Sequence, residues 1–213
     1  MMRKFVLPLL CSLVFMPDLA FGVDINVKLS VPQNITATAG QTLTVPINLD
    51  NISGAFTLDS YQLIVSYDQN FFDTPVSSGI QLGSLTTGLS YSGSDNVDSA
   101  GHYISMLRSN VSNSVNLTSS SSGSLMTFQI RVKSSATAGS SGYLNLLASQ
   151  GASNTEIITL SGAPDNIVFN PAIGTASING SVVIPVPEPS TYAMAMVAVL
   201  MLLRKLWPKT ILA

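Results

Sequence analysis

The feature that most constrains the fold is a two-residue alternation of apolar and polar side chains, which recurs through the middle of the chain. It is clearest in SLMTFQIRVK, where Met126, Phe128, Ile130 and Val132 alternate with polar residues. Such alternation is typical of strands that bury only one of their faces. The segments QTLTVPINLD and DSYQLIVSYD repeat the pattern, and residues 23–185 show no convincing helical period.

Clusters of Gly, Ser, Asn and Asp divide this region into eight or nine short runs. The spacing predicts two packed antiparallel sheets, and therefore an all-β sandwich. Pro46 lies inside one of the runs and cannot donate a backbone hydrogen bond. We therefore expect its strand to lie at a sheet edge or to be interrupted there.

The first 22 residues have the order of features that defines a secretory signal peptide. Arg3 and Lys4 supply positive charge, an apolar run follows, and Ala20 and Gly22 are the small residues that precede a cleavage site. We therefore predict a signal peptide over residues 1–22, cleavage after Gly22, and export of the remainder.

The exported region is thinly charged and acidic. Residues 23–190 contain ten acidic and four basic side chains, which gives a formal net charge of −6. This balance argues against nucleic acids and anionic lipid surfaces as partners. The only cysteine of the sequence, Cys11, lies in the predicted signal peptide, so a buried core rather than disulfides must stabilise the domain.

Four segments of the middle region resemble the cohesin-type domain. In chain order they read ATAGQTLTVPINLDN, YQLIVSYDQNFFD, GIQLGSL and GSLMTFQIRVKSSATAGSSGYLNL, and they cover most of residues 36–184. They match the opening G-x-x-x-x-V-P-V strand, the Tyr-Asp turn and the late L-x-x-F-x-V strand of that family. Gln69 departs from the pattern, because the family usually has proline after the Tyr-Asp pair.

The resemblance implies a jelly-roll sandwich of nine strands that serves as a protein- or glycan-binding module. Cellulosomal cohesins bind dockerins, but no dockerin-contacting residue can be matched in this sequence. The alternative is a dedicated carbohydrate-binding domain linked to polysaccharide metabolism. An aromatic strip for sugar binding is conceivable, with core packing as the competing explanation, from Tyr61, Tyr67, Tyr91 and Tyr103.

Few residues of the domain are suited to catalysis or to metal binding. His102 is the only histidine and Glu156 the only glutamate of the domain, so triads and carboxylate pairs have few candidate members. Asp95 and Asp98 offer oxygen atoms that suit calcium, but their loop lacks the acidic pattern of a dedicated site. We therefore predict a binding module with no enzymatic activity, cofactor or metal site.

The C-terminal segment differs in composition from the domain. Twelve apolar residues, 192–203, lie between a proline-rich stretch and the basic pair Arg204 and Lys205. Twelve residues are fewer than the ~20 that span a bilayer core, but flanking residues and snorkelling bases extend the run. We predict a transmembrane helix over residues 191–207, with Arg204 and Lys205 as its cytoplasmic stop.

This ending also resembles the PEP-CTERM sorting signal of Gram-negative bacteria, in which VPEPST precedes an apolar helix and a basic cluster. The resemblance implies that Pro187, Glu188 and Pro189 form the recognition motif, and that the partner is an exosortase-type processing enzyme at the cytoplasmic membrane. Proteins of this class are associated with extracellular polysaccharide and biofilm or floc matrix. The residues LWPKTILA after the basic pair are a departure from the usual ending.

We therefore expect three parts, namely a signal peptide (1–22), a cohesin-like sandwich (23–185) and a PEP-CTERM signal (186–213). The protein is expected to be exported and anchored in the membrane through its C-terminus. It then reaches the cell surface or the extracellular matrix, where polysaccharide or a surface protein is its partner.

Overall fold

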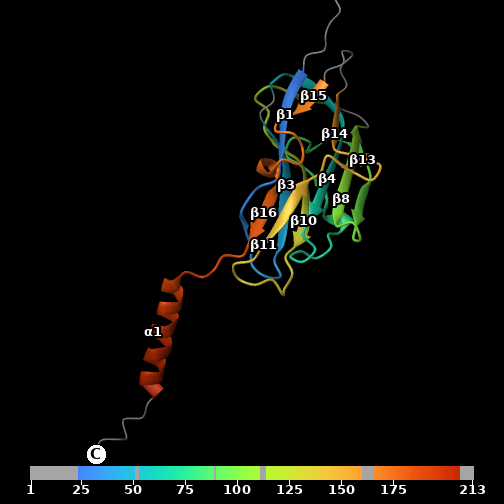
Figure 1. Cartoon of the computed structure of the whole chain (residues 1–213). Coiled ribbons are helices and arrows are strands. Elements are labelled where there is room, and N and C mark those ends of the chain that lie inside the picture. Colours follow the sequence, from blue (N-terminus) through green and yellow to red (C-terminus); the bar gives the residue numbers. More distant parts are fainter. Residues whose placement is uncertain (1–23, 51–52, 89, 111–113, 160–165, 207–213) are drawn as a thin grey trace, which may run out of the picture.

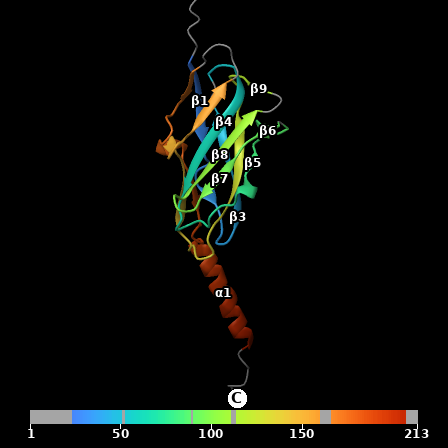
Figure 2. The same ribbon diagram turned by 90° about the vertical axis from the view of Figure 1, so that its right-hand side faces the viewer.

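Two β-sheets pack face to face, and one helix stands beyond one end of this sandwich (Figure 1, Figure 2). The all-β sandwich expected from the alternation is confirmed. The predicted signal peptide, with Ala20 and Gly22, lies outside the part of the chain that the structure describes. The computed structural model describes residues 24–50, 53–88, 90–110, 114–159 and 166–206.

The smaller sheet has five strands, and antiparallel pairing prevails except at one edge. Across the sheet the strands are β15 (Asn166–Phe169), β1 (Asp24–Ser30), β3 (Thr42–Asp50), β10 (Gly123–Arg131) and β5 (Gln81–Leu82). β1 and β15 form the parallel pair. Phe128 lies opposite Val45, and Gln129 opposite Thr44, so the two central strands present matching faces.

Pro46 lies in the interior of this sheet, so the expectation of an edge or interrupted strand is wrong. β3 runs unbroken between β10 and β1. Within β3, only Asn48, Leu49 and Asp50 pair with β1. At Pro46 the strand is therefore paired on the β10 side alone, and a position with one open side is one that tolerates proline in a sheet.

The larger sheet has nine strands and is built on the long strand β4 (Phe56–Tyr67). β8 (Tyr103–Asn110) pairs with one side of β4, while β11 (Ser141–Leu146) and β14 (Glu156–Thr159) share the other side. The remaining strands are β2 (Ile35–Thr36), β6 (Tyr91–Ser92), β7 (Asp95–Asp98), β9 (Val115–Leu117) and β16 (Gly180–Val183). Outside both sheets lie the hairpin of β12 (Ser149–Gln150) and β13 (Ser153–Asn154), and the 3-10 turns η1 (Ser77–Gly79) and η2 (Ala176–Ile178).

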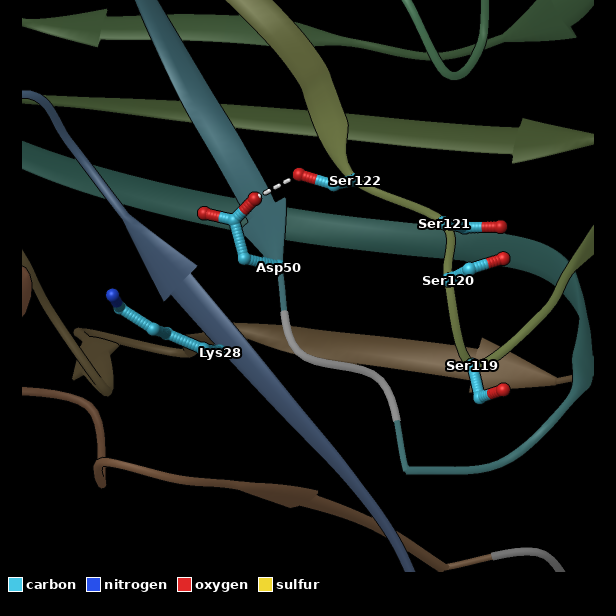
Figure 3. A pocket seen from close by; sticks show the side chains of 6 residues that line it. All are labelled: Lys28, Asp50, Ser119, Ser120, Ser121 and Ser122. Carbon is cyan, nitrogen blue, oxygen red and sulfur yellow. Dashed lines mark hydrogen bonds between the residues drawn. The ribbon is translucent and has the colours of Figure 1, made fainter.

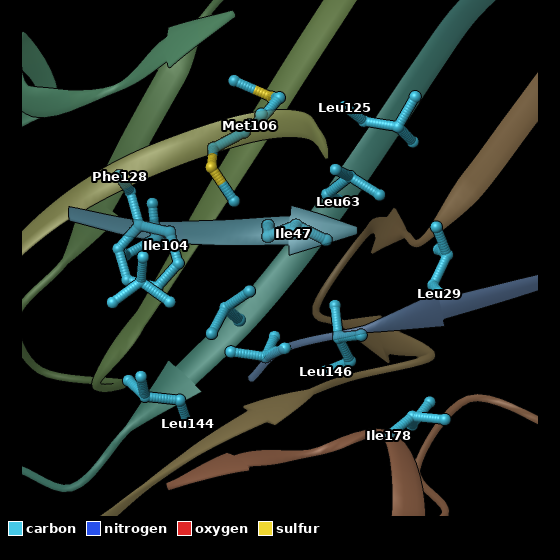
Figure 4. Close-up of a cluster of buried hydrophobic side chains, with 14 of the residues drawn as sticks. Leu29, Ile47, Leu63, Ile104, Met106, Leu125, Phe128, Leu144, Leu146 and Ile178 are labelled. Carbon is cyan, nitrogen blue, oxygen red and sulfur yellow. The ribbon is translucent and has the colours of Figure 1, made fainter. Parts of the chain in front are cut away.

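The core lies between the two sheets, where the apolar positions of the alternation meet. Figure 4 shows Ile47 and Phe128 of the smaller sheet together with Leu63, Ile104 and Leu144 of the larger one. All five are buried. Each sheet thus buries one face, as expected for an aligned sandwich.

After β16 the chain passes through four exposed residues, 185–188, into the helix α1 (Pro189–Leu206). Backbone hydrogen bonds still hold Ile184 to the sandwich. Its N–H donates to Ser140 O (3.0 Å), and its carbonyl accepts from Gly139 N–H (2.8 Å). We call this end of the sandwich, which includes residues 68–70 and 132–140, the tail end.

The helix α1 coincides with most of the segment predicted to span a membrane. Its residues 194–202 are exposed. In the part of the chain that the structure describes, no helix is long and apolar enough to cross a membrane. The expectation of a transmembrane helix over 191–207 is therefore not supported, because the polar first turn and the basic last turn leave an apolar stretch shorter than the roughly 20 residues of a bilayer core.

Candidate functional site

The outward surface of the larger sheet carries exposed apolar side chains. Alternation in β4 and β8 turns Gln62, Ser105 and Leu107 away from the core, and Gln62 Nε2 donates to Ser105 Oγ at 3.0 Å. On β11 and β14, Tyr143 is 48% exposed and Ile158 is 46% exposed. We call the outward side chains of Gln62, Leu107, Tyr143 and Ile158 the Tyr143 face.

The hairpin of β12 and β13 interrupts this surface between β11 and β14. Thr155 ties the base of this hairpin to β4, because its hydroxyl donates to Leu147 O (2.6 Å) and accepts from Ile64 N–H (3.1 Å). Ile64 is buried but is not part of the core cluster, and β13 packs against β4 in this region. Tyr143 and Ile158 therefore lie on the two strands that flank the hairpin.

Core packing, the competing explanation for the conceivable aromatic strip, is confirmed for two of its four tyrosines. Tyr61 and Tyr67 are buried in the core. Tyr61 donates its hydroxyl to Leu125 O at 3.2 Å, and burial raises the pKa of this hydroxyl far above its usual value. Tyr91 packs edge-on against Tyr61, with 5.8 Å between the ring centroids. A sugar-binding function therefore cannot use these tyrosines as a stacking surface.

Asp95 forms a bidentate ion pair with Arg108 rather than a cation site. Arg108 Nη1 lies 2.6 Å from Asp95 Oδ1, and Nη2 lies 2.9 Å from Oδ2. The two side chains are only 12% and 18% exposed. Next to the pair, Gly93 passes so close to β8 that an added Cβ would lie 2.0 Å from Leu107 O. The ion pair and the glycine together fasten β6 and β7 to β8.

Asp98 and His102 belong to the turn that joins β7 to β8. Asp98 Oδ1 accepts from the N–H groups of Gly101 (2.8 Å) and Ala100 (2.9 Å), and the bond from Gly101 is the main cause of a lowered pKa of this carboxyl. His102 has φ 55° and packs edge-on against Tyr67. Within the described residues no three His, Cys, Asp or Glu side chains form a group that could hold a metal ion.

A polar pocket of about 300 Å³ lies at the end of the sandwich opposite the tail end. Its walls are Lys28, Asp50 and the four serines 119–122. Ser122 donates to the Asp50 carboxylate, whereas the hydroxyls of Ser119, Ser120 and Ser121 point away from it (Figure 3). The polar groups of this pocket therefore do not converge on one point.

The residues of the predicted sorting motif lie where the chain leaves the sandwich. Pro187 and Glu188 are exposed, and Pro189 is the first residue of α1. Arg204 and Lys205 lie in the last turn of α1. Their roles in sorting remain predictions.

Two mostly antiparallel sheets packed around one apolar core define an all-β sandwich domain. The model of the cohesin domain family matches residues 27–167. The chain therefore belongs to the cohesin domain family. The resemblance expected from the sequence is confirmed for this domain.

Solved structures show the same fold at low sequence identity. The non-cellulosomal cohesin of Archaeoglobus fulgidus is 22% identical with a TM-score of 0.50, and the match covers 79% of this chain and 97% of that chain. The third ScaC cohesin of Acetivibrio cellulolyticus, solved in complex with the ScaB dockerin, is 19% identical with a TM-score of 0.52 and coverages of 75% and 99%. The type III cohesin of the ScaE scaffoldin from Ruminococcus flavefaciens is 12% identical with a TM-score of 0.54 and coverages of 76% and 89%. A comparison with curated proteins gives no match.

Proposed function

We propose that this chain is an exported surface or extracellular-matrix protein whose cohesin domain binds a partner protein through the Tyr143 face. The observation that carries the proposal is the exposure of Tyr143 and Ile158 on the two strands that flank the β12–β13 hairpin. Exposed aromatic and aliphatic side chains on a rigid sheet are typical anchors of protein interfaces.

The proposed partner is a surface protein that carries a dockerin or a dockerin-like domain. Membership of the cohesin family supports this choice, as does the dockerin that occupies the solved complex of the Acetivibrio cohesin. The module itself needs no catalytic group for this function, because affinity comes from buried contact area and its anchors.

The test compares Tyr143→Ser with Val76→Ser, since Val76 is 60% exposed but lies in the segment that leads to the smaller sheet. Each purified full-length variant is immobilised and offered the surface proteins of the native host. We expect the immobilised Tyr143→Ser variant to bind about one tenth, or less, of the amount of partner that wild type binds, as for the loss of an interface anchor. Val76→Ser should retain as much as wild type. Equal retention by the two variants would remove the Tyr143 face from the proposal.

The C-terminal segment is proposed to act as a PEP-CTERM sorting signal. Support comes from the exposed positions of Pro187 and Glu188 between Ile184, whose backbone is hydrogen-bonded to the sandwich, and the helix. An extended, proline-rich stretch is accessible to a processing enzyme of the exosortase type. The helix with its basic residues Arg204 and Lys205 is proposed to hold the chain at the cytoplasmic membrane until processing.

The sorting proposal is tested with Glu188→Ala and with a chain that ends at Pro185. We expect Glu188→Ala to be exported but to stay uncut in the membrane fraction of the native host. The truncated chain should be soluble in the periplasm. Mass spectrometry and fractionation distinguish these outcomes. A wild-type chain that keeps its full tail, together with no change for Glu188→Ala, would exclude processing.

A further inference from the structure

A groove of about 330 Å³ lies on the other side of the molecule, beside the tail-end half of β10. Residues 73–76 form one wall. They belong to the segment 73–80, which we call the strap. The outward side chains of the smaller sheet form the floor. The residues on which the following argument rests are Thr42, Asp73, Pro75, Val76, Gln129 and Arg131.

The strap is anchored to β10 at both ends, so the groove is preformed. At one end Phe72 bridges to Val132, and Asp73 N–H donates to Arg131 O at 2.9 Å. At the other end β5 pairs with Met126 and Thr127 of β10. A site that needs no closure avoids the entropic cost of ordering a loop on binding.

Gly79 sets how closely the far part of the strap approaches the sheet. It is buried, and an added Cβ would lie 2.8 Å from Gln129 Cβ. The backbone at Gly79 therefore packs against the base of the Gln129 side chain, and Gln129 is still exposed to solvent on the floor of the groove. An amide in this position presents both donors and an acceptor to the groove.

Arg131 and Asp73 face the groove as a loose pair. Arg131 Nε donates to Gly40 O at 3.1 Å, which fixes the orientation of the guanidinium. The distance from Nε to Asp73 Oδ2 is 3.9 Å, which is too long for a hydrogen bond. Their side chains are 57% and 45% exposed. The carboxylate and the guanidinium therefore keep hydrogen-bonding capacity for a ligand, while their charges cancel.

Beyond Asp73 the strap adds an apolar surface to the groove. Pro75 is buried, which holds the strap against the sandwich, and Val76 next to it is 60% exposed. The groove thus combines an acceptor (Asp73), a donor (Arg131) and an amide (Gln129) with one aliphatic surface. A ligand that fits this combination has groups that both donate and accept hydrogen bonds, no net charge, and an apolar face.

We propose that this groove binds one sugar unit of a neutral polysaccharide. Ring hydroxyls donate to Asp73 and accept from Arg131 and Gln129, and the C–H face of the ring packs on Val76. The volume lies at the lower end of the range for small-molecule sites, as a single ring requires. The site lies on the sheet opposite to the Tyr143 face and does not depend on the proposed protein binding.

The test titrates the full-length chain, purified in detergent, with cellohexaose, xylohexaose and mannohexaose, and follows binding by isothermal calorimetry. We expect saturable binding of at least one hexaose. Arg131→Gln and Asp73→Asn should each weaken it about tenfold, the size of one lost charge-assisted hydrogen bond. Lys28→Gln, a matched loss of one positive charge at the opposite end of the sandwich, should leave binding unchanged. Tyr143→Ser should also bind normally, which separates this site from the proposed protein interface.

Three outcomes would overturn the proposal. The first is the absence of saturable binding to all three hexaoses. The second is binding that Arg131→Gln and Lys28→Gln weaken equally, because the groove would then not be the site. The third is Arg131-dependent binding of an extended Ser/Thr decapeptide in place of the sugars, which would assign the groove to a peptide. Unchanged melting temperatures of the two groove variants show that a loss of binding is not a loss of folding.

Discussion

Each sheet carries an arginine–aspartate pair, and the two pairs differ in geometry and in exposure. On the larger sheet Arg108 and Asp95 meet in a bidentate contact at 2.6 Å and 2.9 Å, with side chains 12% and 18% exposed. On the smaller sheet Arg131 and Asp73 stand 3.9 Å apart and are about half exposed. The same two residue types therefore have different consequences in the two places.

The difference follows from which side of the strand each arginine occupies. Arg108 lies opposite Tyr61 of β4 and shares its inward side, so its charge is largely withdrawn from water and must be paired. Arg131 lies at the outward side of β10, where water solvates it and pairing is optional. The pair of Arg108 and Asp95 therefore fastens strands together, whereas Arg131 and Asp73 both remain able to contact a ligand.

The largest expected effect tests which side of β10 faces water. Phe128→Asp places an unpaired carboxylate in the core and should cost more than about 4 kcal/mol of the free energy of unfolding. Gln129→Asp should cost less than about 1 kcal/mol because its side chain is on the exposed side. Urea unfolding followed by circular dichroism measures both. Similar losses for the two variants would mean that Arg131 does not lie on an outward surface.

The second prediction compares the two arginines directly. Arg108→Met leaves Asp95 unpaired and mostly buried, so we expect a loss of about 2–3 kcal/mol in the free energy of unfolding. Arg131→Met should change it by less than about 0.5 kcal/mol. Combining Arg108→Met with Asp95→Leu should recover part of the loss, since no unpaired charge remains. If the two single variants are equally stable, burial does not distinguish the pairs.

A smaller effect separates a buried hydroxyl with a partner from one without. Tyr61, which lies opposite Arg108, donates to Leu125 O, so Tyr61→Phe should cost about 1 kcal/mol in the free energy of unfolding. The buried hydroxyl of Tyr67 has no hydrogen-bond partner among the described residues. Tyr67→Phe should therefore be neutral or slightly stabilising. The midpoints of denaturant unfolding measure both variants, provided that the dependence of the free energy on denaturant concentration is unchanged. A larger loss of stability for Tyr67→Phe than for Tyr61→Phe would contradict the prediction.

The smallest effect concerns Asp98, a carboxylate held by backbone N–H groups rather than by an arginine as Asp95 is. Its pKa is lowered in the folded state, chiefly by the Gly101 N–H, so its contribution to stability is present above the usual pKa of 3.8 and is lost as the pH falls through the folded value. Asp98→Asn should be slightly less stable than wild type at pH 7 and equally stable near pH 2. A difference that is independent of pH would show that charge plays no part.

The sequence was sufficient to predict the longer strands because each buries one face; the short strands such as β5, β6 and β9 were not predicted. Phe128 and Gln129 fall on opposite sides of β10 as the alternation requires. The same alternation puts Tyr61 and Tyr67 on one side of β4 with Leu63, and all three side chains are buried in the core. They therefore do not form an aromatic strip. It also turns Tyr143 outward, since its neighbours Gly142 and Leu144 are buried.

The ion pair of Arg108 could be predicted only in part. In HYISMLR the alternation places Arg108 on the same side as Ile104 and Met106, and an arginine at an inward position indicates a buried partner. The partner itself depends on the irregular step at Gly93 between β6 and β7, which local alternation does not encode. The groove was unpredictable for a similar reason, because it arises from a strap anchored at two distant points of β10.

The register of β11 against β16 determines how the domain transmits tension. Tyr143 lies opposite Ser181, and the chain runs from β16 through Ile184 to α1. A force applied between Tyr143 and α1 therefore crosses the antiparallel ladder of Ser141–Leu144 with Gly180–Val183. Where such a pull acts along the strands, it loads the hydrogen bonds of that ladder together, in shear. The tension is thus carried near one margin of the larger sheet, where β16 lies between β2 and β11.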